Sequence, residues 1–148
     1  MSKAAKLPYA TTLLVRDTCL CLHVQRAARA LARRFDEALR PLELTNGQFS
    51  LMMSLSRPEP PGMGAVAELL AMDRTTLTAA LKALERRKLV EVTVDPKDKR
   101  GRLVALTPDG KRLLARAVPI WKRTHAKVEA RFPEGGADRL RGGLRAVG

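Results

Sequence analysis

Residues 73–106 read DRTTLTAALKALERRKLVEVTVDPKDKRGRLVAL, and this stretch decides the fold. Its first half carries leucines four and then three residues apart, so it predicts a helix over residues 74–88 with one apolar face. Asp73 is a suitable N-cap for that helix. Apolar and polar residues then alternate over 90–94 and again over 102–106, and this alternation predicts two β-strands.

The segments around this helix complete a known arrangement of elements. The polar segment 95–101 joins the two predicted strands, which therefore form a β-hairpin with a basic tip. A short apolar helix is predicted over 64–71, and a tight break at residues 72–73 separates it from the next helix. A helix, a turn, a second helix and a basic hairpin, in that order, predict a winged helix-turn-helix.

Longer helices are predicted on both sides of this unit. Apolar residues at helical spacing predict an amphipathic helix from about 17 to 42, and Thr45 and Gln48 then form the pattern of a capping box. After the hairpin, Thr107 and Pro108 predict the start of another long helix. The predicted fold is mainly α with a small β-hairpin wing, an α+β arrangement.

We divide the chain into three parts on this basis. Residues 1–44 form an N-terminal arm and a first dimerisation helix, residues 45–106 form the winged helix-turn-helix, and residues 107–148 form C-terminal dimerisation helices. The long helices expose more apolar surface than one small winged helix can cover, which predicts a homodimer.

The charge of the chain indicates a polyanionic partner. Lys and Arg number 28 against 15 acidic residues, and the formal net charge is +13. Aromatic residues make up only 3% of the chain, whereas single-strand and RNA binders need aromatic side chains to stack on bases. Duplex DNA is therefore favoured, ahead of an anionic membrane surface. No apolar run is long enough for a bilayer and no leader pattern precedes the helices, so we expect a cytoplasmic protein without a membrane partner.

The outward face of the helix over 74–88 is the first candidate site. Small and basic side chains suit close approach to base edges in the major groove, and free amides at a helix N-terminus favour phosphate. The alternative is that these are ordinary solvated positions. The candidate residues on this helix are Arg74, Thr75, Thr76, Thr78 and Lys82.

The hairpin tip is the second candidate site. Its basic residues, Lys97, Lys99, Arg100 and Arg102, cluster within six positions and are expected to contact phosphate and the minor groove. A solubilising turn is the alternative. We expect the carboxylate of Asp98 to pair with the guanidinium of Arg100 and so to hold it in place.

Four segments carry a resemblance to a known family: DRTTL at 73–77, LERRKLV at 84–90, DPKDKR at 95–100 and LTPDG at 106–110. In this order and spacing they are similar to the signatures of the MarR family, the multiple-antibiotic-resistance-type regulators. The resemblance implies a homodimer with intertwined terminal helices that binds a pseudo-palindromic operator. We expect it to act as a repressor, with an activator as the alternative. The resemblance also implies release from DNA by oxidation or by a small aromatic or phenolic effector. The effector would be held between the first, second and fifth of the predicted helices, which begin near residues 17, 45 and 107. Lys88 stands where the family usually has glycine.

Cys21 is the candidate redox sensor. The organic-hydroperoxide branch of the family has a reactive cysteine early in the corresponding helix, but it also uses tyrosines, and Tyr9 is the single tyrosine here. The alternative is that Cys21 is a small, half-buried apolar residue. Cys19 and His23 lie four residues apart on one helix face, but two ligands do not make a metal site.

Two other functional classes compete with a sequence-specific regulator. An enzyme is disfavoured because the chain has no phosphate-binding loop, no paired metal-binding histidines on a helix and no nucleophile elbow, and we expect no cofactor. A sequence-indifferent architectural DNA-binding protein is the more serious alternative.

Overall fold

The structure of the chain is a computed structural model that describes residues 4–148, and the first three residues of the predicted arm lie outside this range. It is mostly helical with a two-stranded antiparallel hairpin, which confirms the predicted fold class. The elements are α1 (Tyr9–Thr18), α2 (Leu20–Leu39), the 3-10 turn η1 (Arg40–Leu42), α3 (Asn46–Ser54), α4 (Met63–Leu70), α5 (Arg74–Arg86), β1 (Val90–Val94), β2 (Arg102–Leu106), α6 (Pro108–Glu129) and α7 (Gly136–Val147).

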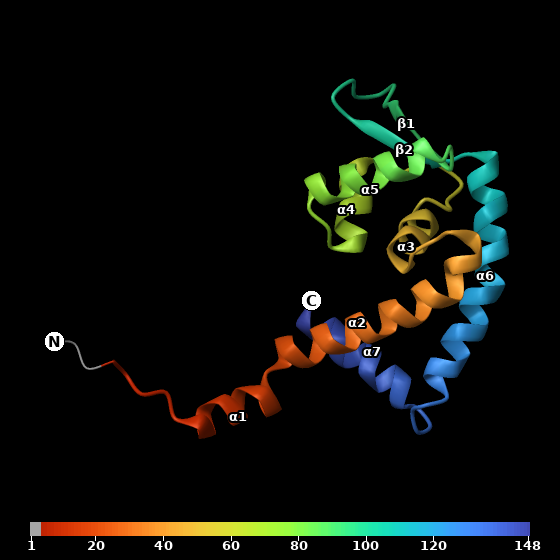
Figure 1. The fold of residues 1–148 in the computed structure, drawn as a ribbon. Coiled ribbons are helices and arrows are strands. Elements are labelled where there is room, and N and C mark those ends of the chain that lie inside the picture. Colours follow the sequence, from red (N-terminus) through yellow and green to blue (C-terminus); the bar gives the residue numbers. More distant parts are fainter. Residues whose placement is uncertain (1–3) are drawn as a thin grey trace.

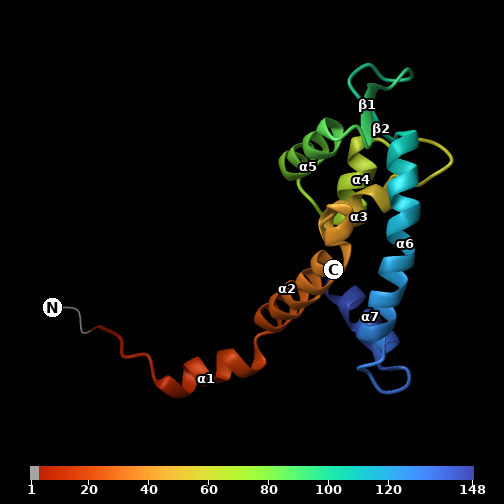
Figure 2. The same ribbon diagram turned by 45° about the vertical axis from the view of Figure 1, so that its right-hand side comes forward.

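The elements form two regions that α6 connects. In Figure 1 the hairpin, α4 and α5 lie at one end of the molecule, and α2 and α7 lie at the other. Helix α6 runs along both regions and packs against α2 and α3. Helix α1 projects away from the rest of the chain in both views (Figures 1 and 2). None of the helices among residues 4–148 is both long enough and apolar enough to cross a membrane.

The N-terminal helix differs from the prediction of one continuous helix over 17–42. The chain forms α1 and then breaks at Cys19, whose ψ of 112° is extended rather than helical. At this break the hydroxyl of Thr18 donates to the carbonyl of Leu14 at 2.7 Å, a back-bond of the kind that often bends helices. No residue of α1 is buried, so no packing holds α1 in line with α2.

A hydrophobic cluster joins α3, α4, α5, the hairpin and the upper part of α6 to the end of α2. The predicted inward face of α5 is confirmed, because Leu77, Leu81 and Leu84 are all buried in this cluster. Burial of that face leaves the opposite face of α5 in solvent. The core therefore decides which side of α5 is available to a ligand.

Predicted helix caps are also confirmed. The hydroxyl of Thr45 accepts from the amide of Gln48, and the Gln48 side chain accepts from the Thr45 amide, so the capping box is complete. Asp73 caps α5, and Thr107 caps α6 with Pro108 in its first turn.

Three helical segments end with a non-glycine residue in the left-handed region: Glu43 at φ 54°, Ala71 at φ 52° and Lys88 at φ 59°. At Lys88 the amide donates to the Glu85 carbonyl and the next amide, of Leu89, donates to the Leu84 carbonyl. This pairing is a Schellman motif, which satisfies carbonyls at the end of α5. Lysine can occupy the position that glycine usually holds, at some cost in backbone strain.

The end of α5 is attached directly to the start of α6. The hydroxyl and the amide of Thr107 donate to the carbonyls of Lys88 and Leu89, at 2.7 Å and 3.0 Å. One turn later, Gly110 lies so close to this segment that an added Cβ would stand 2.0 Å from the Leu89 carbonyl oxygen. The obstacle is backbone, which a rotamer change cannot move aside. Glycine is therefore required at position 110.

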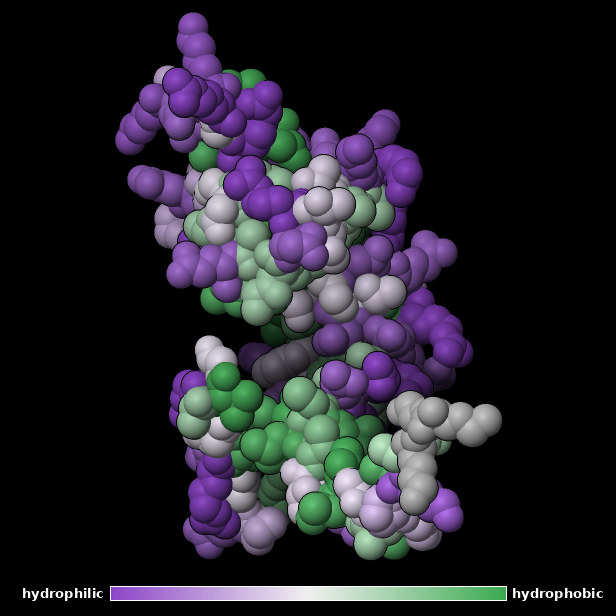
Figure 3. All heavy atoms as spheres, turned by 90° about the vertical axis from the view of Figure 1, so that its left-hand side faces the viewer, coloured by the Kyte–Doolittle hydropathy of each residue, from purple (hydrophilic) through white to green (hydrophobic). Residues whose placement is uncertain are grey.

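Exposed apolar side chains gather at the end of the molecule opposite the hairpin. Figure 3 shows a continuous apolar area over its lower part, whereas the hairpin at the top is hydrophilic. A contiguous area of this kind differs from apolar residues scattered singly over a surface, and it is typical of an interaction site. The large exposed apolar residues of this region are Tyr9, Leu14, Val15, Leu20, Val24, Leu31, Phe132, Leu140, Leu144 and Val147.

We expect Gly110→Ala to lower the free energy of unfolding by about 1–3 kcal/mol, because the new methyl group overpacks the junction between α5 and α6. Gly64→Ala is the matched control, since nothing lies within 4 Å of the added Cβ and alanine favours a helix. Urea denaturation of both variants measures the difference. Equal stability of the two variants would contradict the close approach.

Candidate nucleic-acid interface

The exposed face of α5 carries the first set of predicted site residues. Arg74, Thr75, Thr76, Thr78 and Lys82 are all exposed. The helix begins at Arg74, so this face runs from its N-terminus into its middle, beside the hairpin (Figure 1).

Asp73 occupies the N-terminus of α5, which changes the expectation for Thr76. The amide of Thr76 donates to Asp73 Oδ1 at 2.7 Å and its hydroxyl donates to Oδ2 at 2.9 Å. The sequence suggests that this amide is free to bind phosphate, but it is occupied by Asp73. Thr76 is therefore mainly part of the helix cap.

The same hydrogen bonds affect the charge of the cap. The amide and then the hydroxyl of Thr76 hold the pKa of the Asp73 carboxyl below its usual value. Because this pKa is lower in the folded chain, the stabilisation is present above the ordinary aspartate pKa. It is lost as the pH falls through the lowered pKa.

The remaining side chains of this face differ in their freedom. The hydroxyl of Thr78 donates to the carbonyl of Arg74 at 2.8 Å, which directs it back along the helix. Arg74, Thr75 and Lys82 make no side-chain hydrogen bond within residues 4–148, so all three can turn toward a ligand.

The hairpin tip is a turn held by its own aspartates. Asp95 Oδ1 accepts from the amide of Lys97 at 2.9 Å, and Asp98 Oδ1 accepts from the amide of Arg100 at 3.1 Å. The expected pairing of the Asp98 carboxylate with the Arg100 guanidinium is wrong, because this carboxylate is directed at backbone. Within residues 4–148 no ion pair forms between these two side chains.

Arg102 also serves the turn itself. Its guanidinium donates from Nη1 to the carbonyls of Lys99 and Gly101, at 3.2 Å and 3.1 Å. Arg102 is exposed, but Lys97, Lys99 and Arg100 are the exposed tip cations whose side chains make neither a hydrogen bond nor an ion pair in the described part of the chain.

A third extended segment fixes the direction of the hairpin. The amide of Val104 donates to the carbonyl of Pro61 at 2.9 Å, and Gly62 pairs with Leu103 in an isolated bridge. Gly62 immediately precedes α4, and β1 contacts α5, so the hairpin is tied to both helices of the helix-turn-helix. The tip and the exposed face of α5 therefore form parts of one basic surface.

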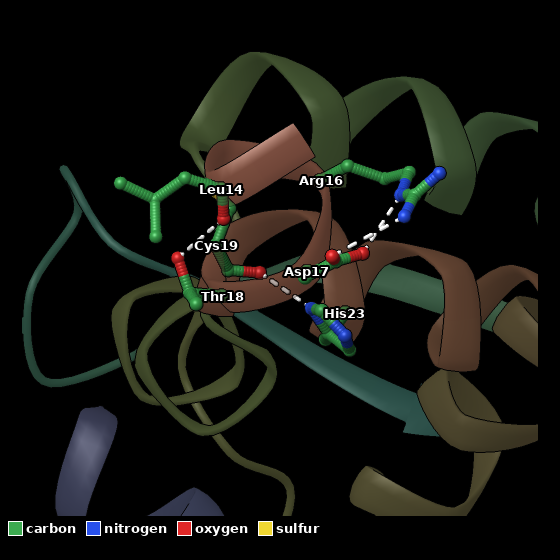
Figure 4. Close-up of polar contacts among 6 residues, drawn as sticks. All are labelled: Leu14, Arg16, Asp17, Thr18, Cys19 and His23. Carbon is green, nitrogen blue, oxygen red and sulfur yellow. Dashed lines mark hydrogen bonds and ion pairs between the residues drawn. The ribbon is translucent and has the colours of Figure 1, made fainter. Parts of the chain in front are cut away.

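The cysteine segment lies far from this surface, at the break between α1 and α2. Cys21 is exposed and Cys19 is half-buried, and both are free thiols. Figure 4 shows the His23 ring against the main chain, where its Nδ1 donates to the carbonyl of Cys19 at 2.8 Å. No group of three potential metal ligands occurs among residues 4–148.

The space between α2, α3 and α6, where the effector was expected, is filled by aromatic rings. Trp121 stacks on His125 with centroids 4.6 Å apart and on Phe49 at 6.3 Å, and Phe35 lies 6.5 Å from Trp121. These side chains come from all three helices and form one aromatic cluster.

An open groove of about 560 Å³ lies beside these rings, between α3, α4 and α6. Phe49 and Trp121 contribute aromatic surface, Leu69 contributes apolar surface, and Ser50 and Lys122 contribute polar atoms. The sequence did not single out this groove, because its residues come from separate helices that share no motif.

Comparisons with known proteins point in one direction. The MarR family model matches residues 44–101. The organic hydroperoxide resistance transcriptional regulator of Bacillus subtilis is 30% identical over 101 residues, 68% of this chain and 69% of that protein. The transcriptional regulator HosA of Escherichia coli is 39% identical over 80 residues, 53% of this chain but only 58% of HosA.

Solved structures agree with this over more of the chain. The M. tuberculosis transcriptional regulator MosR, crystallised in complex with DNA, is 36% identical and superposes with a TM-score of 0.80, covering 88% of this chain and 93% of MosR. The transcriptional repressor CouR, bound to a 23-mer DNA duplex, is 26% identical and superposes with a TM-score of 0.80. The superposition covers 97% of this chain and 99% of CouR.

We expect Arg102→Ala to loosen the hairpin tip, because it removes the bonds to two turn carbonyls. Each such bond contributes about 0.5–1.5 kcal/mol, so the loss of both should make the amides of residues 95–101 exchange roughly 5- to 150-fold faster. Arg100→Ala removes the same charge without removing those bonds. Amide hydrogen exchange followed by mass spectrometry compares the two, and equal exchange rates would contradict the role of Arg102.

Proposed function

Because this chain belongs to the MarR family of transcriptional regulators, we propose that it is a homodimer that binds duplex DNA at a pseudo-palindromic operator and represses transcription. The observation that carries the proposal is the basic surface formed by the exposed face of α5 and the three cations of the hairpin tip. The DNA complex of MosR, which is 36% identical, supports the same use of the fold.

In this proposal α5 enters the major groove and the hairpin tip reaches the minor groove. Arg74, Thr75 and Lys82 are free to meet base edges, where hydrogen-bonding groups distinguish the base pairs. Lys97 and Lys99 contact phosphate, and Arg100 enters the narrow, electronegative minor groove. Thr76, Thr78, Asp98 and Arg102 support this surface by holding the helix start and the turn.

The homodimer follows from the apolar area at the other end of the molecule. Exposed leucines and valines of α1, α2 and α7 remain in water in one chain, and a second copy removes this surface from solvent. We retain the three-part division of the chain as a proposal, with 1–44 and 107–148 supplying the dimer contacts and 45–106 binding DNA.

Membership in a family of regulators leaves the enzyme alternative without support. The architectural alternative remains testable, because it predicts equal affinity for any duplex. The relatives named above are bacterial, and bacterial DNA lies in the cytoplasm, so we propose that the chain acts there.

We propose two alternative triggers for release from DNA, an aromatic ligand and oxidation of Cys21. The groove beside Trp121 suits a planar aromatic ring, and Lys122 at the same groove suits a carboxylate on that ring. Cys21 is exposed and therefore accessible to an oxidant, as a redox sensor must be.

We expect Lys82→Ala and Lys97→Ala to weaken DNA binding in different ways, although each removes one lysine charge. Lys82→Ala should cost about 1–3 kcal/mol on an operator selected from a pool of random duplexes, and little on a random duplex. Lys97→Ala should weaken both alike and lower the slope of log K against log salt by about one.

Fluorescence anisotropy across a salt series measures both affinities, and sedimentation of the complex should report two chains per duplex. If Lys82→Ala weakened the two duplexes equally, α5 would not be reading bases and the architectural alternative would be preferred. A single chain per duplex would contradict the homodimer.

The trigger can be identified through the single tryptophan of the chain. We expect hydroxybenzoates to quench Trp121 fluorescence and to release the operator, and Lys122→Ala to reduce both effects, because Trp121 and Lys122 line the same groove.

An organic hydroperoxide tests the other trigger. We expect DNA binding by Cys21→Ser to be insensitive to the hydroperoxide and Cys19→Ser to respond normally. Release by hydroperoxide in Cys21→Ser would remove the redox role of Cys21.

A further inference from the structure

Arg87 joins the end of the DNA-contacting helix to the end of the dimerisation helix. It follows α5 directly, and its guanidinium donates from Nη1 to the carbonyl of Glu43 at 2.6 Å. Nη2 donates to the carbonyl of Leu42 at 3.4 Å. These partners stand 44 and 45 residues earlier in the chain, so the contact is wholly tertiary.

The two carbonyls lie where the helical path of α2 terminates. The turn η1 continues α2 and ends at Glu43 in the left-handed region. Carbonyls at such an end lack partners within the helix and carry the negative end of its dipole. A guanidinium can bridge two of them with fixed geometry, whereas a lysine presents a single point charge.

On its other side the same segment is bound to α6. Thr107 donates to the carbonyls of Lys88 and Leu89, the two residues after Arg87. Residues 87–89 are thus held between the end of α2 and the start of α6. A change in the angle between these long helices must shift this segment, and α5 with it.

A second bond joins the same two regions. Asp36 of α2 accepts from the amide of Asn46 at 2.6 Å, at the first residue of α3. This contact holds α3, whereas Arg87 acts on α5 itself. Arg87 is therefore a direct hydrogen-bonded link between the end of α2 and the end of α5, in addition to the hydrophobic cluster that these helices share.

We propose that Arg87 is a positioning residue that fixes α5 against α2 and thereby sets the distance between the two DNA-contacting helices of the dimer. This inference rests on the proposed function. Dimers of helix-turn-helix proteins bind half-sites about one turn of DNA apart, so a loosely held α5 should tolerate more than one spacing. Arg87 itself need not touch DNA, because its guanidinium is directed at the carbonyls of Glu43 and Leu42.

The test compares the dependence of binding on half-site spacing. An operator is selected with the unmodified chain from random duplexes, and versions with one base pair inserted or deleted between the half-sites are made. The full-length variants Arg87→Ala, Arg87→Lys and Arg86→Ala are compared with the unmodified chain. Arg86→Ala removes an equal charge from the adjacent position, where the side chain makes no hydrogen bond within residues 4–148.

We expect Arg87→Ala to bind the selected operator roughly 2- to 30-fold more weakly, the range typical of residues that couple two regions. Its affinities for the three spacings should also become more alike, with Arg87→Lys intermediate. Arg86→Ala should keep the spacing preference of the unmodified chain. Thermal unfolding of each variant identifies those that are folded at the assay temperature, and Arg87→Lys carries the test if Arg87→Ala is not.

An unchanged spacing preference in the folded Arg87 variants would overturn the inference, as would an equal loss of preference in Arg86→Ala. A chain that selects no operator from the random pool would instead contradict the proposed function. The two failures are therefore distinguishable.

Discussion

The approach of Gly110 to the carbonyl of Leu89 is the constraint on which the DNA-contacting unit depends. It brings the first turn of α6 against the segment that ends α5. The strands begin and end at this junction, where Val90 pairs with Leu106. The hairpin must therefore leave the body beside α5, and its basic tip lies on the same side as the exposed helix face.

Acidic residues near this surface are used for the backbone rather than for its cations. Asp73 accepts from the start of α5, while Asp95 and Asp98 accept from amides of the hairpin turn. Hydrogen bonds to backbone amides stabilise these carboxylates where they stand. Although aspartates lie between them in sequence, the cations at the tip form no ion pair with these aspartates within the described residues and are available to a polyanion.

The other end of the molecule follows a different physical rule. Its arms α1 and α7 contain no buried residue, and the apolar area that they share with α2 is exposed to solvent in the single chain. The second chain of the proposed homodimer would cover it. Burial of apolar surface is non-directional, so it can hold two chains together without fixing their angle. Directional contacts such as those of Arg87 and Thr107 are needed to relate that angle to α5.

Local pattern alone determined the boundaries of both strands, the caps at Thr45, Asp73 and Thr107, and the buried face of α5, because each depends on residues within a few positions of one another. Tertiary contacts decided the rest. Arg87 meets carbonyls more than forty residues away, and the groove beside Trp121 is assembled from three helices. The break at Cys19 separates α1 from α2, and α1 has no buried residue in the described part of the chain; the periodicity of the sequence alone predicts a continuous helix there.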